Sequence, residues 1–182
     1  MEHPAHGLGT GVVAEKQEGD GLGDQGVVVR WDGTVYQPVP LAPALTAKLA
    51  SGEFTRWNAI FGWSSTNVWL AGDKGVIGHW DGTIISLLPL SNSSPQFNYL
   101  GMPEWRGVTG GNPAQQDVWF IGSNGHYAYA ALGASSVDAN RWNCADYAAV
   151  NPTTPNVRTY TENFNAISCT TTPAYDCWAV GD

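Results

Sequence analysis

Short hydrophobic runs recur three times along the chain in the same order. Each copy opens with an aromatic residue and a hydrophobic run, passes through a turn, and ends in a tryptophan-centred run followed by glycine and a polar residue. The copies span residues 57–73, 105–123 and 164–182. Short strands repeated at this spacing predict an all-β fold of radially repeated sheets.

The clearest unit runs from residue 54 to residue 90. Its hydrophobic runs predict four antiparallel strands, which cover residues 56–62, 68–72, 76–80 and 83–88. Asp81-Gly82, between the last two, is a strong signal for a two-residue hairpin turn, because both positions of such a turn favour positive φ. Four antiparallel strands in a segment of this length make one blade of a β-propeller.

A second unit begins at Trp105 and is less regular. Here the pattern predicts a third strand over residues 126–131, a link over 133–140 and a last strand near 141–147. Residues 42–50, rich in Ala and Leu after Pro43, predict a helix inserted between units.

The two ends of the chain hold complementary halves of the repeat. Residues 24–34 match residues 73–83, so the N-terminal part predicts a third and a fourth strand, whereas residues 164–182 predict a first and a second. We therefore predict four-stranded antiparallel blades of the β-propeller type, about three blade equivalents per chain, with a terminal blade shared between the N- and C-terminus. The domain division is a flexible tail at 1–23 and repeats at 24–182.

Three blades are fewer than the roughly four to eight of known propellers. Two arrangements resolve this. Two chains pair head to tail as a homodimer that completes a six-bladed ring, or the chain is a piece of a longer propeller cut within a blade. The sequence does not choose between them.

Composition narrows the classes of partner. The chain has 182 residues, a net charge of −8 and only 8 Lys and Arg residues, which argues against nucleic acid and against anionic lipid surfaces. No apolar run is long enough to cross a bilayer, so we expect no membrane insertion. Residues 1–20 show no apolar leader, so the protein is cytosolic or its signal lies upstream.

Cys169 and Cys177 flank a predicted turn between two antiparallel strands. Their sulfurs can form a disulfide if the Cα atoms lie within about 7 Å; the alternative is two buried free thiols. Cys144 is left over and is expected to be a small core residue. No Cys/His spacing resembles a zinc site, and we expect no metal and no cofactor.

The phrases at residues 67–73 and 176–182, together with the Trp-Asp-Gly-Thr turns at 31–34 and 80–83, resemble repeats of bacterial secreted β-propellers. These are the repeats of photosystem II stability/assembly-factor-like proteins and, more distantly, of Asp-box propellers. The resemblance covers about residues 24–182 and implies an extracytoplasmic protein: secreted, periplasmic or on the cell surface. The cysteine pair is similar to the hairpin disulfide of some such repeats.

One departure from the Asp-box pattern matters. A proper Asp-box carries Ser or Thr two residues before its Asp, and Arg30 and His79 stand there in this chain. Asp32 and Asp81 are therefore expected to be turn residues first.

Tryptophan is abundant, with nine residues. Large rings fill the wedge between adjacent blades, and we expect this role for the tryptophans at equivalent strand positions: Trp57, Trp69, Trp105, Trp119 and Trp178. The remaining candidates stand beside turns and are expected to be more exposed. An exposed ring next to Asp can stack on a sugar, so the candidate ligand-binding residues are Trp31, Asp32, Trp63, Trp80 and Asp81. The alternative for these residues is partial burial at a blade edge.

The predicted function is a non-enzymatic, extracytoplasmic binding or assembly module that recognises a protein partner or a glycan, with no catalytic residues. A propeller lectin is one alternative. A sialidase-like glycan hydrolase is another, and it would need a cluster of arginines and a tyrosine nucleophile. The arginines available to it are Arg30, Arg56, Arg106, Arg141 and Arg158.

Overall fold

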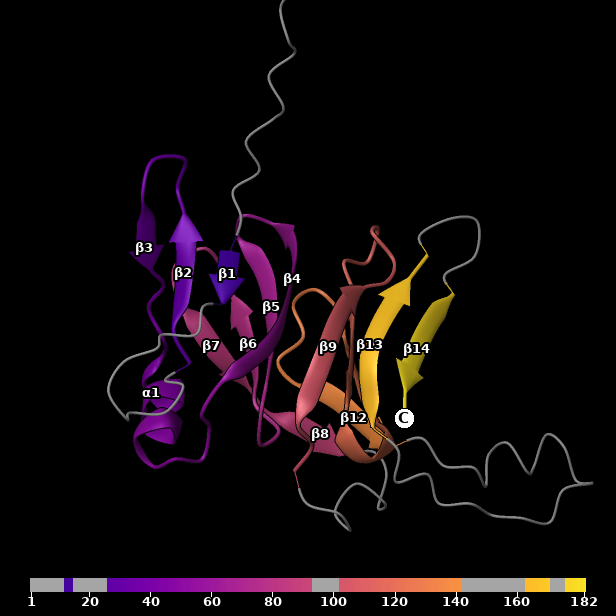
Figure 1. Cartoon of the computed structure of the whole chain (residues 1–182). Helices are drawn as coiled ribbons and strands as arrows, with labels where there is room; N and C mark the ends of the chain where they lie inside the picture. The colour runs from indigo at the N-terminus through magenta and orange to yellow at the C-terminus, as the bar shows by residue number, and fades with distance from the viewer. Residues whose placement is uncertain (1–11, 15–25, 93–101, 142–162, 171–175) are drawn as a thin grey trace, which may run out of the picture.

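The computed structural model describes residues 12–14, 26–92, 102–141, 163–170 and 176–182. These residues form four β-sheets that stand side by side, with the N-terminal sheet and the C-terminal sheet on opposite sides of the molecule (Figure 1). The fold is mostly β and built of antiparallel sheets, as the repeat predicts.

The first four-stranded sheet contains β4 (Trp57–Ser64), β5 (Asn67–Gly72), β6 (Ile77–Trp80) and β7 (Ile85–Leu88). Their spatial order is β4-β5-β6-β7 and every pair is antiparallel. The predicted four-stranded antiparallel sheet is thus confirmed. All of β5 is buried, because it lies inside the sheet and is covered on both faces by neighbouring sheets.

The second sheet contains β9 (Trp105–Gly110), β10 (Val118–Gly122), β11 (His126–Ala130) and β12 (Val137–Arg141), with the short 3-10 helix η2 (Ser123–Gly125) before β11. β8 (Leu90–Asn92) adds a fifth, parallel strand outside β12. Because β9–β12 match the four strands of the first sheet, we refer to both as the four-stranded sheets. The prediction that the last strand of this sheet starts near residue 141 is wrong. It begins at Val137, because that fully buried side chain and the pairing of Val137 with Leu90 fix the strand there.

The N-terminal sheet consists of β1 (Val12–Ala14), β2 (Val28–Trp31) and β3 (Tyr36–Pro38), in that order. α1 (Pro43–Ala50) follows it, close to the prediction. The tail assigned to residues 1–23 contains β1, so the boundary at residue 24 leaves out one strand; the rest of that tail lies outside the described residues.

The C-terminal sheet consists of β13 (Phe164–Cys169) and β14 (Cys177–Gly181). The prediction that both chain ends share one sheet is wrong for this single chain. β2 pairs with β1 and β3, and β14 pairs with β13. The two full sheets lie between these ends, because each sheet packs on its sequence neighbours and the row does not curve back on itself (Figure 1). No closed ring forms among the residues that the structure describes.

The first strands of successive sheets lie next to one another: β4 contacts β9, and β9 contacts β13. Second strands also contact the next first strand, as β5 does with β9 and β10 does with β13. β1 contacts β4 in the same way. β1 therefore occupies the place of a second strand in the N-terminal sheet.

Two hydrophobic cores fill the spaces between sheets. One joins the N-terminal sheet and α1 to the first four-stranded sheet and includes Trp57, Phe54 and Val28. The other joins the two four-stranded sheets and includes Trp69 and Trp105. Packing between sheets is thus confirmed for these three tryptophans. Within the described residues no helix is long and apolar enough to cross a membrane.

Candidate functional site

The two predicted Asp residues hold hairpin turns. One carboxylate oxygen of Asp81 accepts hydrogen bonds from the Thr83 hydroxyl at 2.6 Å and from the Thr83 and Ile84 amides at 2.8 and 3.0 Å. These bonds, the Thr83 hydroxyl first, lower the pKa of Asp81 to about 2. The amides of Val35 and Thr34 likewise lower the pKa of Asp32. Both residues are turn residues, and their role in ligand binding stays a prediction.

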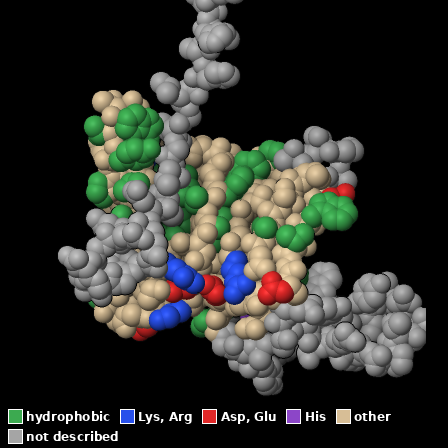
Figure 2. All heavy atoms as spheres, viewed as in Figure 1, with side chains coloured by type: hydrophobic (Ala, Val, Ile, Leu, Met, Phe, Trp, Pro, Cys, Tyr) green, Lys and Arg blue, Asp and Glu red, His purple; other side chains and the backbone are tan. Residues whose placement is uncertain are grey.

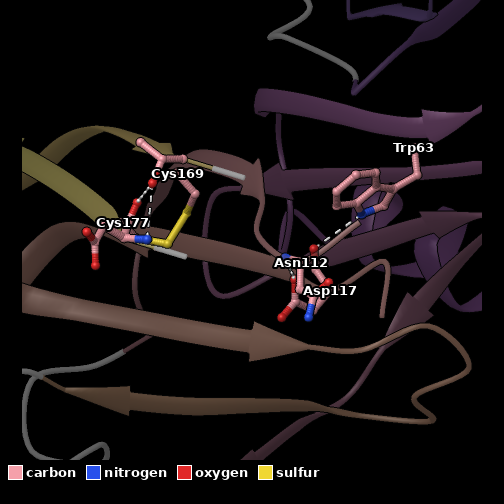
Figure 3. Close-up of a disulfide and its surroundings, with 7 residues drawn as sticks. Trp63, Asn112, Asp117, Cys169 and Cys177 are labelled. Atoms are coloured by element: carbon pink, nitrogen blue, oxygen red, sulfur yellow. Dashed lines mark hydrogen bonds between the residues drawn. A yellow bond between two sulfur atoms is a disulfide. The ribbon is translucent and has the colours of Figure 1, made fainter. Parts of the chain in front are cut away.

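The three tryptophan candidates lie in different environments. Trp80 is only 5% exposed and its indole donates to the Ser65 carbonyl at 3.0 Å, so the expectation of an exposed ring is wrong. Trp63 is half-buried at the end of β4 and donates to the Asp117 carbonyl at 3.2 Å (Figure 3). Trp31 is half-buried on β2, where its ring packs 4.9 Å from that of Tyr36. The candidates therefore belong to three separate segments and do not make one site.

Two arginines of the hydrolase alternative come together across the first strands. Arg56 and Arg106 both form salt bridges with Glu104, the second at 3.2 Å. Burial opposes ionisation of Glu104, but hydrogen bonds from the two guanidinium groups outweigh it and lower its pKa. Arg106 also donates to the Asn165 side chain at 2.7 Å. Lys, Arg, Asp and Glu side chains line this lower edge of the molecule in Figure 2.

Both arginines are thus already paired with a carboxylate of the chain itself. We call Arg56, Glu104 and Arg106 the arginine row; Arg30 is not part of it and lies on β2 in the N-terminal sheet. The side chain of Arg141 and all of Arg158 fall outside the described residues, as does Cys144. Among the described residues, no group of three or more His, Cys, Asp or Glu side chains is placed to hold a metal ion.

A side-chain motif missed by the sequence analysis recurs on the second and third strands of the sheets. In the first four-stranded sheet, Asn67 Oδ1 accepts from the indole of Trp69 at 2.8 Å and lies 2.9 Å from His79 Nε2. Trp69 and His79 are directly opposite in the strand register, with ring centroids 4.4 Å apart. We call this polar residue, tryptophan and third-strand residue the cross-strand triad.

The second sheet repeats the triad with Asp117, Trp119 and Tyr129. Trp119 and Tyr129 are opposite in the register and their ring centroids lie 4.9 Å apart. Desolvation, together with the charge of Asp117 and a hydrogen bond to it, raises the pKa of Tyr129. The triad thus links the second and third strands in both four-stranded sheets.

The C-terminal sheet holds two members of a third triad, Asp176 and Trp178. Among the described residues no strand pairs with the outer side of β14, so the third member is missing. Every residue of β14 is exposed, with Trp178 at 71% and Val180 at 63%. The prediction that Trp178 packs between blades is therefore wrong for this chain. We call residues 176–181 the open edge.

The disulfide between Cys169 and Cys177 closes the hairpin that carries the open edge (Figure 3). The two residues are directly opposite in the register and their Cα atoms are 4.0 Å apart, so the predicted pairing is confirmed. The triad could have been identified from the sequence, because the repeat aligns Asp176 and Trp178 with Asn67 and Trp69.

Fold and site define a mostly β repeat protein with two four-stranded antiparallel units and one sheet that has two strands among the described residues. No family model and no curated protein matches the chain. Among solved structures, the chain is similar to one titled YCF48 bound to D1 peptide, at 13% sequence identity and a TM-score of 0.43. The match covers 85% of this chain and 40% of that one, so the chain spans well under half of the other's length. The fold assignment rests on the strand pairing within this chain.

Proposed function

We propose that this chain is a non-enzymatic binding and assembly module that captures a strand of a protein partner on its open edge. The observation that supports this most is the exposure of β14, whose five residues are all accessible. An edge strand presents unpaired backbone N–H and C=O groups, and an added strand satisfies them while its side chains give specificity.

The composition of β14 supports a binding role. Free edges are usually guarded by lysine, proline, a bulge or an inward-facing charge. β14 reads Cys-Trp-Ala-Val-Gly and carries no lysine, proline or charged residue, and the irregularity of this hairpin lies on its partner β13, between Phe164 and Ala166. Figure 2 shows hydrophobic side chains exposed on the side of the molecule where Figure 1 places the C-terminal sheet.

The arginine row supports a role other than hydrolysis. Glu104 already bridges Arg56 and Arg106, so a substrate carboxylate would have to compete with it for their guanidinium groups. The disulfide is of the kind that persists in oxidising compartments, which supports an extracytoplasmic location for the module.

A peptide selection tests this function. A library of random strand-length peptides displayed on phage is selected against the wild-type chain. Peptides are then measured against a Trp178→Lys/Val180→Lys variant, whose charges guard the edge. We expect peptides that bind the wild type at micromolar affinity and lose at least about tenfold in the variant. A Met102→Lys/Leu132→Lys variant, which changes two exposed hydrophobic residues outside the C-terminal sheet, is the matched control. The proposal fails if every selected peptide binds the guarded variant as well as the wild type, or if none is selected.

A second candidate function is glycan binding at the β2–β3 hairpin. There Tyr36 is 62% exposed and packs on Trp31, next to the Asp32 carboxylate. An aromatic platform beside a carboxylate suits a sugar ring and its hydroxyls. A glycan array with the wild type and with a Trp31→Ala/Tyr36→Ala variant tests it: binding that disappears in the variant supports a lectin, and an empty array removes this candidate.

A further inference from the structure

The third-strand partner that the open edge lacks is present elsewhere in the same sequence. Residues 24–34 match residues 73–83, and in that match Arg30 on β2 is the equivalent of His79 on β6. His79 is the third-strand member of the first cross-strand triad, and Tyr129 is its equivalent in the second. Arg30 is therefore the residue that would complete a triad with Asp176 and Trp178.

Within a single chain, the edge of β2 where a second strand would pair is already occupied by a short strand, β1. β1 pairs with it over three residues, with Val12 opposite Arg30 and Ala14 opposite Val28. β5 pairs with β6 in the same register, with Trp69 opposite His79. In both four-stranded sheets the second strand has a tryptophan at this position, Trp69 or Trp119, and a polar residue two positions before it. In β1 the tryptophan position is held by Val12.

We propose that β14 of one copy of this chain pairs with β2 of a second copy and displaces β1 there. This inference rests on the proposed function, because it names the occupant of the open edge. The repeat fixes the register: Trp178 lies opposite Arg30, Ala179 opposite Val29 and Val180 opposite Val28. The result is a four-stranded sheet made of β13 and β14 from one copy and β2 and β3 from the other.

Charge complementarity favours this occupant. In the first triad the neutral Asn67 serves both Trp69 and His79. In the new sheet the Asp176 carboxylate accepts from the indole of Trp178 and pairs with the guanidinium of Arg30, which also stacks on the indole face. Arg30 Nε is buried without a hydrogen-bond partner among the described residues, and Asp176 is exposed, so both groups gain a partner.

The arrangement of the strands points the same way. β1 contacts β4 as β5 contacts β9, so β14 of the second copy enters a place beside β4 that the fold already provides.

Two copies carry a net charge of −8 each and repel at long range. That repulsion is screened beyond about 8 Å at physiological ionic strength, so the local Arg30–Asp176 pair decides recognition.

Each junction pairs β14 of one copy with β2 of the other, so a two-fold axis between two copies generates both junctions at once. Two copies form two such junctions and close, since two four-stranded sheets per copy and two shared sheets make six, within the range of about four to eight for propellers. The species we propose is therefore a dimer with twice the 19.5 kDa mass of the chain.

Charge reversal at the junction tests the pairing. We expect the wild type to be a dimer by light scattering during gel filtration. Arg30→Glu and Asp176→Arg each place like charges across the junction, and each is expected to weaken dimerisation by at least about tenfold. A one-to-one mixture of the two variants restores complementary charges at both junctions, so it is expected to recover the dimer, as is the variant with both changes in one chain.

The mixture keeps the test valid if a single variant folds poorly, because recovery requires two folded chains with opposite charges. Lys48→Glu, which breaks the exposed salt bridge of α1 with Glu53, is the control for a charge change away from the junction and is expected to leave the dimer unchanged.

Three outcomes overturn the proposal: a wild type of 19.5 kDa at every concentration tested, a dimer that neither reversal weakens, or reversals that weaken it without recovery on mixing. These results are distinct from failure of the proposed function. A monomer that still binds edge-specific peptides keeps the strand-capture function and removes only the second copy as its occupant.

Discussion

Trp69 and Trp178 occupy the same position in the repeat but opposite environments, so replacing each by alanine separates the effect of position from the effect of packing. Trp69 is 1% exposed and lies in the core between the two four-stranded sheets, and Trp178 is 71% exposed on the open edge. We expect Trp69→Ala to destabilise the monomer strongly and Trp178→Ala to have a small effect.

The magnitudes follow from buried area. Full burial of a tryptophan removes about 200 Å² from water, worth about 5 kcal/mol at roughly 25 cal/mol per Å². Trp69 has almost all of this, and its lost hydrogen bond to Asn67 adds about 1 kcal/mol. Trp178 at 71% exposure has less than a third, about 1.5 kcal/mol. Since area sums are upper bounds, we expect losses of about 3–5 kcal/mol for Trp69→Ala and about 1 kcal/mol or less for Trp178→Ala.

The assay is urea unfolding followed by far-ultraviolet circular dichroism, because both variants alter tryptophan fluorescence. It is run at a protein concentration low enough for a monomer, where only packing within one chain contributes. Losses of equal size for the two variants would refute the reasoning, since they would mean that β14 is covered within a single chain as β5 is.

Two further predictions follow from local bonds. Replacing Cys169 and Cys177 by serine removes the bond that links two residues at a sequence separation of 8, and it is expected to lower the free energy of unfolding by about 2–3 kcal/mol. The same urea midpoint for the oxidised wild type and for the double serine variant would contradict this. The pKa of Asp81 is about 2 in the folded chain and about 3.8 without its turn, so the carboxylate stabilises the fold above about pH 4 and that contribution is lost as the pH falls toward 2. Carboxyl NMR titration should give this low pKa in the wild type and a higher one in Thr83→Val, which removes the hydroxyl donor, and an Asp81 pKa near 3.8 in the wild type would contradict the turn geometry.

Local sequence signals were sufficient for the first four-stranded sheet. The Asp81-Gly82 turn and the alternation on either side depend on neighbouring residues, so β6 and β7 could be found without any tertiary information. α1 was also predictable, because Pro43 and the Ala- and Leu-rich run after it act within one helix. The sequence offered the disulfide as one of two alternatives, because its two cysteines flank a predicted hairpin turn.

Features that depend on contacts between sheets could not be predicted. β1 spans only three residues, too few to stand out as a hydrophobic run, and it forms because the edge of β2 is available to it. Trp80 precedes a turn, a position that suggests exposure, but it faces the core shared with the N-terminal sheet. Trp178 matches a buried residue in the repeat and is exposed because burial depends on the strand beside it. The Arg56–Glu104–Arg106 row likewise joins residues far apart in sequence.

The central claim is that β14 is an open acceptor edge in one chain and is covered when a second copy adds its β2. Amide hydrogen exchange of Cys177–Gly181, read by NMR as a function of protein concentration, tests this claim most directly, with β5 (Asn67–Gly72) as the internal reference. The account predicts fast exchange of the outward-facing β14 amides in dilute solution and protection approaching that of β5 as the dimer forms. Protection of β14 that is already complete in the monomer, or fast exchange that persists at every concentration, would contradict it.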